Sequence, residues 1–415
     1  MKLSTELRPG IDQVGYVDYN VRDFHGYDTR LGATYNAYLI RDEKVALIDT
    51  VKTPFAAQLK RNVASLVDLE KVDYLVCLHA ELDHAGALPA MVEACPNAVV
   101  VCNAKCKDAL AGFFDVSNWK FQIVASGDTL SLGKRSLAFV NIPMVHWPES
   151  SVAYMPEEKI LFSNDAFGQH IATSIRFDDE LDLPKIMEEA KSYYANIVAP
   201  YGKQVLNVLK TVQTLDLELI APAHGVMWRS NIPAILDAYQ RWASGKYAPK
   251  VLVIYDSMWQ STEMMAEEIY AGAVEKGQEL TKANPSEPRL DAQLMHARKT
   301  ALTRVATESL DAGAVAFGSA TLNACLMPEM AAVLAYVQGL KFVQKDALAF
   351  GSFGWGVGGP EMIQKKLEEI KYPTITPAPL KAKQRPNAET LQACREAGAA
   401  LAQAAWDRYL KTKTL

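Results

Sequence analysis

The 415-residue chain is poor in cysteine: it has six, and no two of them form a C-x-x-C pair. Sparse cysteines without metal-type spacing are typical of reduced thiols in a cytoplasmic protein. Their spacing also excludes a built-in four-cysteine iron or zinc module. If the protein handles electrons, its donor must therefore be another protein or a bound organic cofactor.

The chain also lacks the segments that mark membrane and nucleic-acid proteins. It has no run of 18 or more apolar residues and no apolar signal-peptide core at its N-terminus. Its 43 Lys and Arg against 48 Asp and Glu give a net charge of -5, which implies no broad basic surface. We therefore expect a cytoplasmic protein with no membrane and no nucleic-acid partner.

The length exceeds that of one ordinary domain, and the polar segment 244–250, which contains Gly245 and Pro249, is expected to connect two domains. Residues 1–247 hold six of the seven histidines and many short apolar runs that read as strands, at 35–40, 44–50, 72–78, 97–102, 137–143 and 159–164. Helical patterns lie between these runs at 54–68 and 86–94, and beyond them at 184–198 and 203–215. Many strands with occasional helices favour an α/β sandwich of the αββα type, with two sheets between helical layers.

Residues 248–415 show a stricter alternation of strand and helix. We expect strands at 251–255, 314–318, 346–351 and near 373–378, with helices at about 262–276, 328–338, 360–371 and 387–410. The polar, proline-punctuated segment 281–289 is expected to be a loop. Alternation of this kind predicts a second α/β domain with a doubly wound parallel sheet of about five strands.

The strongest chemical signal is the run His79-Ala80-Glu81-Leu82-Asp83-His84, directly after the apolar run 72–78. Single ligand-type residues then follow later apolar runs, at His146, Asp165 and His224. Any one of these residues alone could have a structural role instead, as a buried, hydrogen-bonded histidine or a helix-capping carboxylate. Seven of them in order, each beyond a strand, predict a metal centre instead. Three carboxylates beside four imidazoles suit iron better than zinc.

The second signal is a set of three loops that follow strands of the second domain. Ser257, Ser261 and Thr262 place three hydroxyls at the start of a helix, where free backbone N–H groups and the helix dipole favour a phosphate. This first loop carries no G-x-G-x-x-G dinucleotide motif, so FMN fits it better than FAD or NAD. A helix N-cap cluster is the structural alternative. The candidate flavin-contacting residues are Ser257, Met258, Trp259, Gln260, Ser261, Thr262, Ser319, Ala320, Thr321, Leu322, Asn323, Ser352, Phe353, Gly354, Trp355 and Gly356.

These motifs carry a resemblance to a known family. Residues 30–245 resemble the metallo-β-lactamase fold, with its H-x-[HE]-x-D-H run and later His, Asp and His. Glu81 stands where the zinc hydrolases of that fold usually carry His. Residues 250–410 resemble flavodoxin, and the joined halves are similar to the flavodiiron proteins (A-type flavoproteins) over essentially the whole chain.

The resemblance implies that His79, Glu81 and His146 hold one iron, that Asp83, His84 and His224 hold the other, and that Asp165 bridges them. His25, Trp147 and Tyr193 are candidate neighbours of the site; the alternatives are an ordinary turn residue for His25 and core packing for Tyr193. The expected activity is reduction of dioxygen to water, of nitric oxide to nitrous oxide, or both. Two non-haem irons and one FMN per chain would carry out this reaction. Rubredoxin or another external donor would supply the electrons. A head-to-tail homodimer or a dimer of dimers would bring flavin and iron together.

Two other functions are consistent with parts of the sequence. One is a binuclear zinc hydrolase with an accessory flavodoxin domain, against which Glu81 argues. The other is an electron carrier that uses only the flavin, with a degenerate metal site. The sequence leaves open the preference between the two gases, the identity of the donor, and whether His84 binds iron in every redox state.

Overall fold

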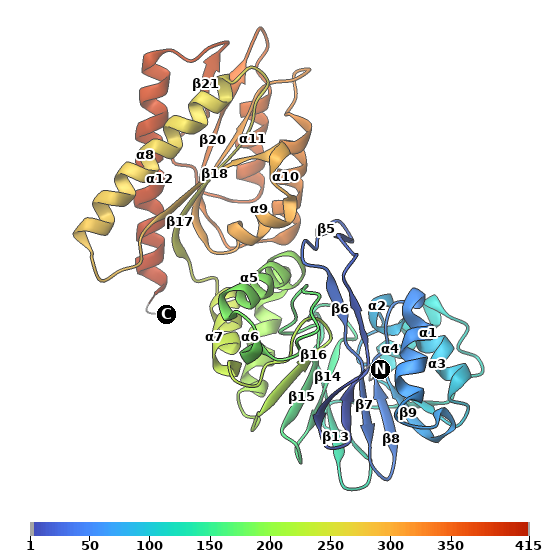
Figure 1. Cartoon of the computed structure of the whole chain (residues 1–415). Helices are drawn as coiled ribbons and strands as arrows, with labels where there is room; N and C mark the ends of the chain where they lie inside the picture. Colours follow the sequence, from blue (N-terminus) through green and yellow to red (C-terminus); the bar gives the residue numbers. More distant parts are fainter. Residues whose placement is uncertain (1–3, 414–415) are drawn as a thin grey trace. The chain divides into compact units, whose positions relative to one another are not determined.

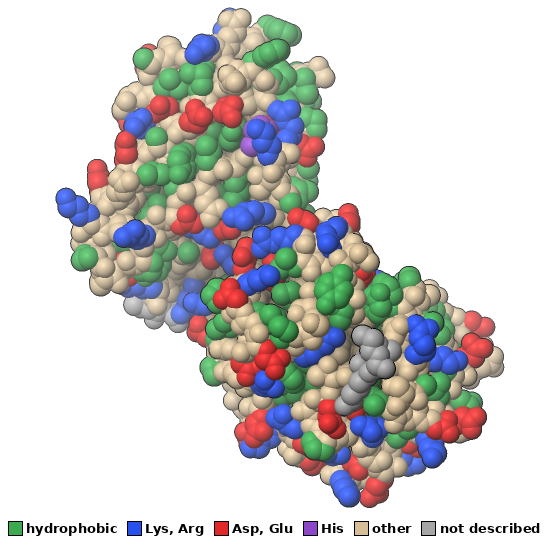
Figure 2. Space-filling view, in the orientation of Figure 1, with side chains coloured by type: hydrophobic (Ala, Val, Ile, Leu, Met, Phe, Trp, Pro, Cys, Tyr) green, Lys and Arg blue, Asp and Glu red, His purple; other side chains and the backbone are tan. Residues whose placement is uncertain are grey.

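The computed structural model describes residues 4–413, which form two compact units divided in sequence between Gln240 and Arg241 (Figure 1). The limits 1–247 and 248–415 remain a prediction about which residues fold independently. Within the described part of the chain, no helix is long and apolar enough to cross a membrane. Basic and acidic side chains are mixed over the face that Figure 2 shows, in keeping with the nearly balanced charge.

The first unit contains two large sheets. The larger has the order β1-β2-β7-β8-β9-β10-β11 and becomes parallel from β8 onward. Its strands are β1 (Thr5–Arg8), β2 (Ile11–Gln13), β7 (Tyr38–Arg41), β8 (Val45–Ile48), β9 (Val72–Val76), β10 (Val99–Cys102) and β11 (Phe121–Ile123). The smaller has the order β12-β13-β14-β15-β16, with only β15 and β16 parallel. Its strands are β12 (Thr129–Ser131), β13 (Ser136–Asn141), β14 (Ser151–Met155), β15 (Ile160–Asn164) and β16 (Leu219–Pro222).

Helices cover the outer faces of both sheets, which completes the αββα sandwich (Figure 1). On the larger sheet lie α1 (Ala56–Ala64), α2 (Leu82–Ala85), α3 (Leu88–Ala94) and α4 (Ala104–Phe113). On the smaller lie α5 (Leu183–Tyr193), the π-helical turn η4 (Tyr194–Val198), α6 (Gly202–Val212) and α7 (Ile232–Ala243). Apolar side chains from both sheets fill the space between them, among them Ile40, Ile48, Phe139 and Phe162. Burial of this apolar surface drives the packing.

Short elements complete the first unit. Two small hairpin sheets are formed by β3 (Tyr16–Asp18) with β6 (Ala33–Tyr35), and by β4 (Asp23–Phe24) with β5 (Tyr27–Asp28). The 3-10 turns are η1 (Thr53–Phe55), η2 (Leu69–Lys71), η3 (Asp178–Glu180) and η5 (Ala199–Tyr201). The single strand expected at 35–40 is divided into β6 and β7, because Asn36 turns its backbone N–H to Ala223 O (2.7 Å) instead of to a neighbouring strand.

The second unit is a five-stranded parallel sheet with the doubly wound order β18-β17-β19-β20-β21, as predicted. Its strands are β17 (Ala248–Asp256), β18 (Asp291–His296), β19 (Ala312–Ser319), β20 (Asp346–Phe353) and β21 (Leu380–Lys383). Its helices are α8 (Ser261–Ala283), η6 (Ala297–Lys299), α9 (Leu302–Ser309), α10 (Pro328–Leu340), α11 (Gly359–Glu369) and α12 (Ala388–Thr412). The order of the strands reverses between β17 and β19, and this is where such sheets bind ligands.

Three local expectations for this unit were wrong. The last strand is β21 at 380–383, because Pro373 and Pro377 remove N–H donors that a strand at 373–378 would need. The segment 281–289 is not wholly a loop, since α8 continues to Ala283. The connector expected at 244–250 ends inside β17, which begins at Ala248.

Candidate functional site

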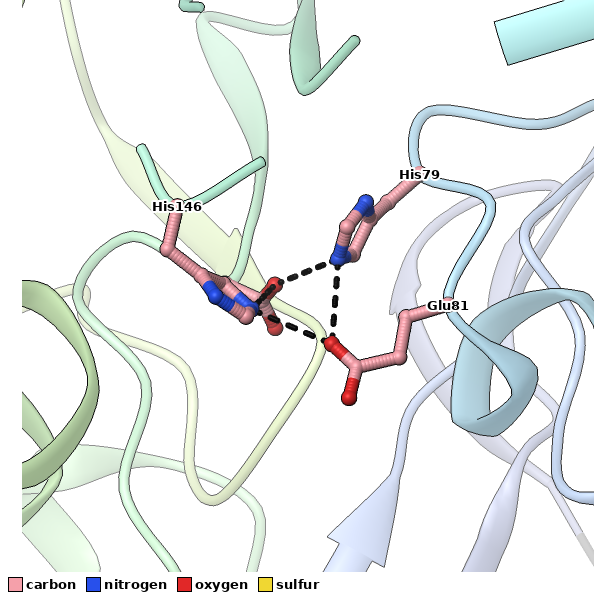
Figure 3. A group of neighbouring side chains, drawn as sticks. His79, Glu81 and His146 are labelled. Carbon is pink, nitrogen blue, oxygen red and sulfur yellow. Dashed lines mark hydrogen bonds and ion pairs between the residues drawn. The ribbon is translucent and has the colours of Figure 1, made fainter. Parts of the chain in front are cut away.

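Four of the seven predicted metal ligands come together from three loops of the first unit. His79 and Glu81 follow β9, His146 lies in the loop after β13, and Asp165 follows β15. Figure 3 shows His79 and Glu81 directed toward His146. The ligand atoms of these four side chains all lie within 4.8 Å of one another. They meet because the ends of β9, β13 and β15 share one rim of the sandwich.

The distances within this first group are those of side chains around a common centre. His79 Nε2 lies 3.3 Å from Glu81 Oε2 and 3.4 Å from Asp165 Oδ2. His146 Nε2 lies 3.1 Å from Glu81 Oε2 and 3.2 Å from Asp165 Oδ2. Two imidazole nitrogens and two carboxylate oxygens therefore face one point.

The other three predicted ligands form a second group of the same kind. Asp83 and His84 lie in the single-turn helix α2, and His224 follows β16. His224 Nε2 lies 3.1 Å from Asp83 Oδ2. His84 Nε2 lies 3.5 Å from Asp83 Oδ1. All three side chains are buried.

Asp165 connects the two groups through its two oxygens. Its Oδ2 faces His79 and His146, while its Oδ1 lies 3.1 Å from His84 Nε2 and 3.3 Å from His224 Nε2. This is the arrangement of a carboxylate that bridges two cations, and it supports the bridging role expected for Asp165.

Several buried atoms at this centre are unsatisfied as hydrogen-bonding groups. Among residues 4–413, Asp83 Oδ1, His84 Nε2 and Asp165 Oδ2 have no hydrogen-bond partner, although each lies within ion-pair distance of a neighbour. A buried polar atom left unsatisfied destabilises the fold. Two cations would satisfy all three atoms at once, so the donor set fits a pair of metal ions.

The pKa values at the centre move in opposite directions for its acids and bases. Burial by itself would raise the pKa of Asp165, but His84, His146 and His224 outweigh it and hold that pKa well below its usual value. Burial by itself would lower the pKa of His146, but Asp165 and Glu81 raise it to about 10. In the same way Asp165 and Asp83 raise the pKa of His224 to about 9. The carboxylates thus favour positive charge at this point, whether protons or metal ions supply it.

The ligand imidazoles are held from behind by groups that sequence reasoning missed. Glu149 Oε1 lies 2.7 Å from His79 Nδ1 and accepts a hydrogen bond from Ala80 N. The backbone carbonyl of Thr34 lies 2.6 Å from His224 Nδ1. Such contacts fix the ring so that Nε2 faces the metal. Thr34 acts through its backbone, and Glu149 is a single acid outside any motif, so the sequence alone marks neither.

Asp49, also missed, joins the two sheets beneath the centre. Its Oδ1 accepts a hydrogen bond from Leu78 N (2.8 Å), and its Oδ2 accepts one from the side-chain amide of Asn164 (3.2 Å). Leu78 precedes His79, and Asn164 precedes Asp165. Burial raises the pKa of Asp49, against the opposing effect of His84. One carboxylate therefore fixes the spacing of two ligand loops from different sheets.

The structure places all three predicted neighbours of the metal centre beside it. His25 Nε2 lies 3.0 Å from Glu81 Oε1, with the His25 side chain 60% exposed. Trp147 meets the His79 ring edge to face, with centroids 5.0 Å apart. Tyr193 donates its hydroxyl to Asp165 Oδ1 at 2.9 Å.

A cavity of about 370 Å³ opens onto the first group of ligands. It is lined by His25, Lys52, Thr53, Pro54, Glu81, Leu82, Asp83, Phe113 and Trp147. His170 is buried against Phe24 and Tyr193, where burial lowers its pKa to about 3. The cavity gives a small molecule access to the ligands.

The first predicted flavin loop, residues 257–262, leads from β17 into α8. Gln260 has a φ of +65°, and α8 begins at the next residue. Thr262 is fully buried and its hydroxyl lies 2.8 Å from that of Ser352 in the third loop. Ser257 Oγ is buried and makes no hydrogen bond within the described chain. The loop thus presents a hydroxyl and the N-terminal N–H groups of α8, and this combination suits a phosphate.

The other two flavin loops follow β19 and β20, the neighbouring strands of the same sheet. Thr321 N donates to Ser352 O (2.8 Å), which joins these loops. Within the described chain, a Cβ added at Gly354 or Gly356 would meet no heavy atom within 4 Å, so the backbone there is open to a ligand. Trp259 is 88% exposed and Trp355 is fully exposed. Exposed large aromatic side chains around open backbone are typical of a ligand site.

The remaining predicted contact residues lie in these same three loops. They are Met258 and Ser261 in the first, Ser319, Ala320, Leu322 and Asn323 in the second, and Phe353 in the third. Ser319 Oγ is committed to its own loop, donating to Ala320 O and accepting from Met327 N. Sequence reasoning missed Arg298, which follows β18 and whose Nε lies 2.7 Å from Oδ1 of Asp256, the last residue of β17 before the first loop.

Two halves of this kind, a metal centre in an αββα sandwich and a set of flavin-type loops on a doubly wound sheet, define a two-module redox protein. Family models agree with this division: residues 33–225 match the ODP family beta lactamase and residues 253–398 match flavodoxin.

Whole-chain relatives give the family. The chain is 42% identical to a nitric oxide reductase of Moorella thermoacetica, over 97% of this chain and 99% of the relative. The flavodiiron protein of Giardia intestinalis has a TM-score of 0.93 and 37% identity, over 99% of this chain and 98% of that one. The rubredoxin oxygen:oxidoreductase of Desulfovibrio gigas has a TM-score of 0.92 and 37% identity, over 98% and 99%. The chain belongs to the flavodiiron protein family.

Proposed function

We propose that this protein reduces dioxygen to water, nitric oxide to nitrous oxide, or both, in the cytoplasm. The single observation that carries the proposal is the position of Asp165, whose two oxygens each face two imidazoles of a separate ligand group. Two relatives named for reactions of these gases support it.

The proposed iron ligands are the seven residues described above. His79, Glu81 and His146 would hold one iron, Asp83, His84 and His224 the other, and Asp165 both. Iron at this centre supplies binding and reduction of the gas, and FMN at the three loops supplies stored electrons. The mixed carboxylate and imidazole set suits iron, as Glu81 already indicated.

The remaining residues of the site control access and protons. Pro54, Leu82, Phe113 and Trp147 give the cavity an apolar wall, which favours an uncharged diatomic gas over ions. His25 Nε2 contacts Glu81 Oε1 while most of its side chain is exposed, so it connects solvent to the ligand shell. Tyr193, which is buried, donates a hydrogen bond from its hydroxyl to Asp165 Oδ1. Reduction of either gas consumes protons, and these two groups are placed to supply them.

The electron donor is proposed to be external, a rubredoxin or another carrier. The chain has no C-x-x-C pair that could hold an iron–sulfur or rubredoxin-type centre of its own. The Desulfovibrio gigas relative is named for rubredoxin, which supports that donor.

We further propose a head-to-tail homodimer, alone or as a dimer of dimers, in which the flavin of one chain serves the irons of another. Each site has an exposed apolar rim: Leu82 and Phe113 at the metal cavity, Trp259 and Trp355 at the flavin loops. Residues 1–240 carry 22 Lys and Arg against 30 Asp and Glu, whereas residues 241–415 carry 21 against 18. Surfaces of opposite net charge favour pairing between unlike units.

The first test is the metal and flavin content of protein purified without oxygen, together with gas consumption under a reduced donor. We expect about two irons and one FMN per chain and turnover of at least one gas. Two zinc ions, with no turnover after the metal is exchanged for iron, would instead favour the zinc hydrolase.

The dimer is tested by mixing two inactive variants, one lacking iron (Asp165→Ala) and one with a defective flavin loop (Thr262→Trp). Random exchange of chains in a head-to-tail dimer should restore about a quarter of the wild-type rate, because half of the dimers then contain one intact flavin–iron pair out of two. Mass-tagged chains show whether the chains exchange. If they exchange and no turnover is restored, the flavin of each chain serves the irons of the same chain.

A further inference from the structure

Asp256 is a buried acid at the end of β17, directly before the first flavin loop. Its side chain is fully buried. Its Oδ1 accepts hydrogen bonds from Ser257 N (2.9 Å) and from Arg298 Nε (2.7 Å). Its Oδ2 has no hydrogen-bond partner among the described residues. The free energy of a buried, ionised carboxylate with one unpaired oxygen depends strongly on the charge of its partner.

Arg298 is that partner, and it reaches the loop from a different strand. It lies in η6, after β18, which is the neighbour of β17 in the sheet. Its guanidinium also donates to the backbone carbonyl of Ser257, so one side chain contacts both the acid and the loop. The Arg298 side chain is 47% exposed, which leaves part of the guanidinium free to contact solvent or a ligand.

The flavin loops themselves contain no cation. Residues 257–262, 319–327 and 352–359 include neither Lys nor Arg. If the phosphate of FMN lies at 257–262, as the proposed function requires, its negative charge is brought beside the buried carboxylate of Asp256. Two like charges in a poorly solvated position repel each other strongly. A cation must offset that repulsion for the phosphate to bind.

We infer that Arg298 is a positioning residue for the flavin phosphate, which neutralises Asp256 and holds Ser257 so that a phosphate-bearing flavin is accepted at this loop. The inference rests on the proposed function, because it takes the FMN site as given, and it adds the residue that makes the site compatible with an anion. The phosphate distinguishes FMN from riboflavin, which lacks it. The affinity for riboflavin should therefore depend far less on Arg298 than the affinity for FMN.

The test is a titration of the flavin-free full-length protein with FMN and separately with riboflavin, followed by quenching of flavin fluorescence. For Arg298→Ala we expect FMN affinity to fall by about tenfold or more and riboflavin affinity to change by less than about threefold. Arg298→Lys, which keeps the charge, should retain most of the FMN affinity. Lys299→Ala is the matched control, since it removes an exposed cation from the same turn, and it should bind FMN as wild type does within about twofold.

A compensating variant separates charge from folding. Asp256→Asn removes the buried negative charge, so Asp256→Asn with Arg298→Ala should recover most of the FMN affinity lost by Arg298→Ala alone. Asp256→Asn by itself should bind FMN at least as tightly as wild type. Thermal unfolding of each variant shows whether the second unit is folded, and Asp256→Asn tests the inference even if Arg298→Ala does not fold.

Three results would overturn the inference: an Arg298→Ala protein that binds FMN like wild type, equal losses for FMN and riboflavin, or weakened FMN binding by Asp256→Asn. Failure of the proposed function is a different result, in which the wild-type protein binds neither flavin.

Discussion

The two units hold their proposed ligands by opposite means. In the first, seven charged or imidazole side chains converge on a buried centre, and the rings of His79 and His224 are held from behind by specific contacts. In the second, three loops offer backbone groups, small residues and two exposed tryptophans. A site built from side chains depends on the identity of each residue, whereas a site built from backbone depends on the local conformation. Single substitutions should therefore be severe in the first unit and graded in the second.

The largest effect should follow from Asp165→Ala, because it removes the one carboxylate shared by both ligand groups. We expect loss of gas turnover by about a thousandfold or more and loss of most of the iron, with FMN content unchanged. Metal analysis, the flavin spectrum and gas consumption measure the three quantities. Asp216→Ala, which changes an exposed acid of the same unit, is the control and should be active. A variant that keeps both irons and turns over normally would show that the bridge is dispensable.

Metal uptake in the first unit should depend on pH. In the metal-free chain the carboxylates raise the pKa of His146 to about 10 and that of His224 to about 9, so both rings are protonated at pH 7. A metal ion must displace those protons, and its affinity therefore rises with pH up to these values. We expect an increase of about tenfold or more per pH unit between pH 6 and 8, measured by competition with a metal-binding dye. An affinity independent of pH, with no proton release in an unbuffered titration, would contradict this.

Glu149→Gln should have an intermediate effect, because the side chain that holds His79 Nδ1 keeps its size and loses its charge. The expected loss of metal affinity is about 10- to 100-fold. Glu157→Gln, at an exposed position of the same unit, serves as the matched control. Equal metal affinities for the two variants would mean that the loop alone orients His79.

The smallest effect is expected for Thr262→Val in the second unit, which removes a buried hydroxyl that contacts Ser352. FMN affinity should fall by about threefold to tenfold, in line with the loss of one hydrogen bond, and iron content should not change. Thr262→Ser should restore most of it. A loss as severe as that of Asp165→Ala in its own unit would show that the flavin loops also depend on single side chains.

The sequence could predict the fold class, the order of strands and helices over most of the chain, and the residues that gather at the metal centre. Those residues are recognisable because four ligand-type side chains, His79, Glu81, Asp83 and His84, follow a buried strand within a few residues, and an apolar core does not need them. The two family modules and the relatives confirm the fold and the function that the resemblance implied.

What the sequence could not predict falls into two kinds. Strand β18 (Asp291–His296) is too polar to show an apolar run, and it forms because β17 offers a full edge for pairing. The supporting groups Glu149 and Asp49 are single acids far from their partners along the chain, and only the fold brings them together. Arg298 belongs to this second kind, since nothing in its surroundings marks it as a neighbour of Asp256.

Asp49 has a consequence for how the protein acquires its metal. By tying Leu78 to Asn164, it fixes the distance between the loops of His79 and Asp165 with no ion involved. Folding therefore orders these two ligand loops. Metal binding then does not carry the entropy cost of ordering them. Chelation and reloading should accordingly be reversible at constant secondary structure, and the newly made chain is able to fold first and take up iron afterwards.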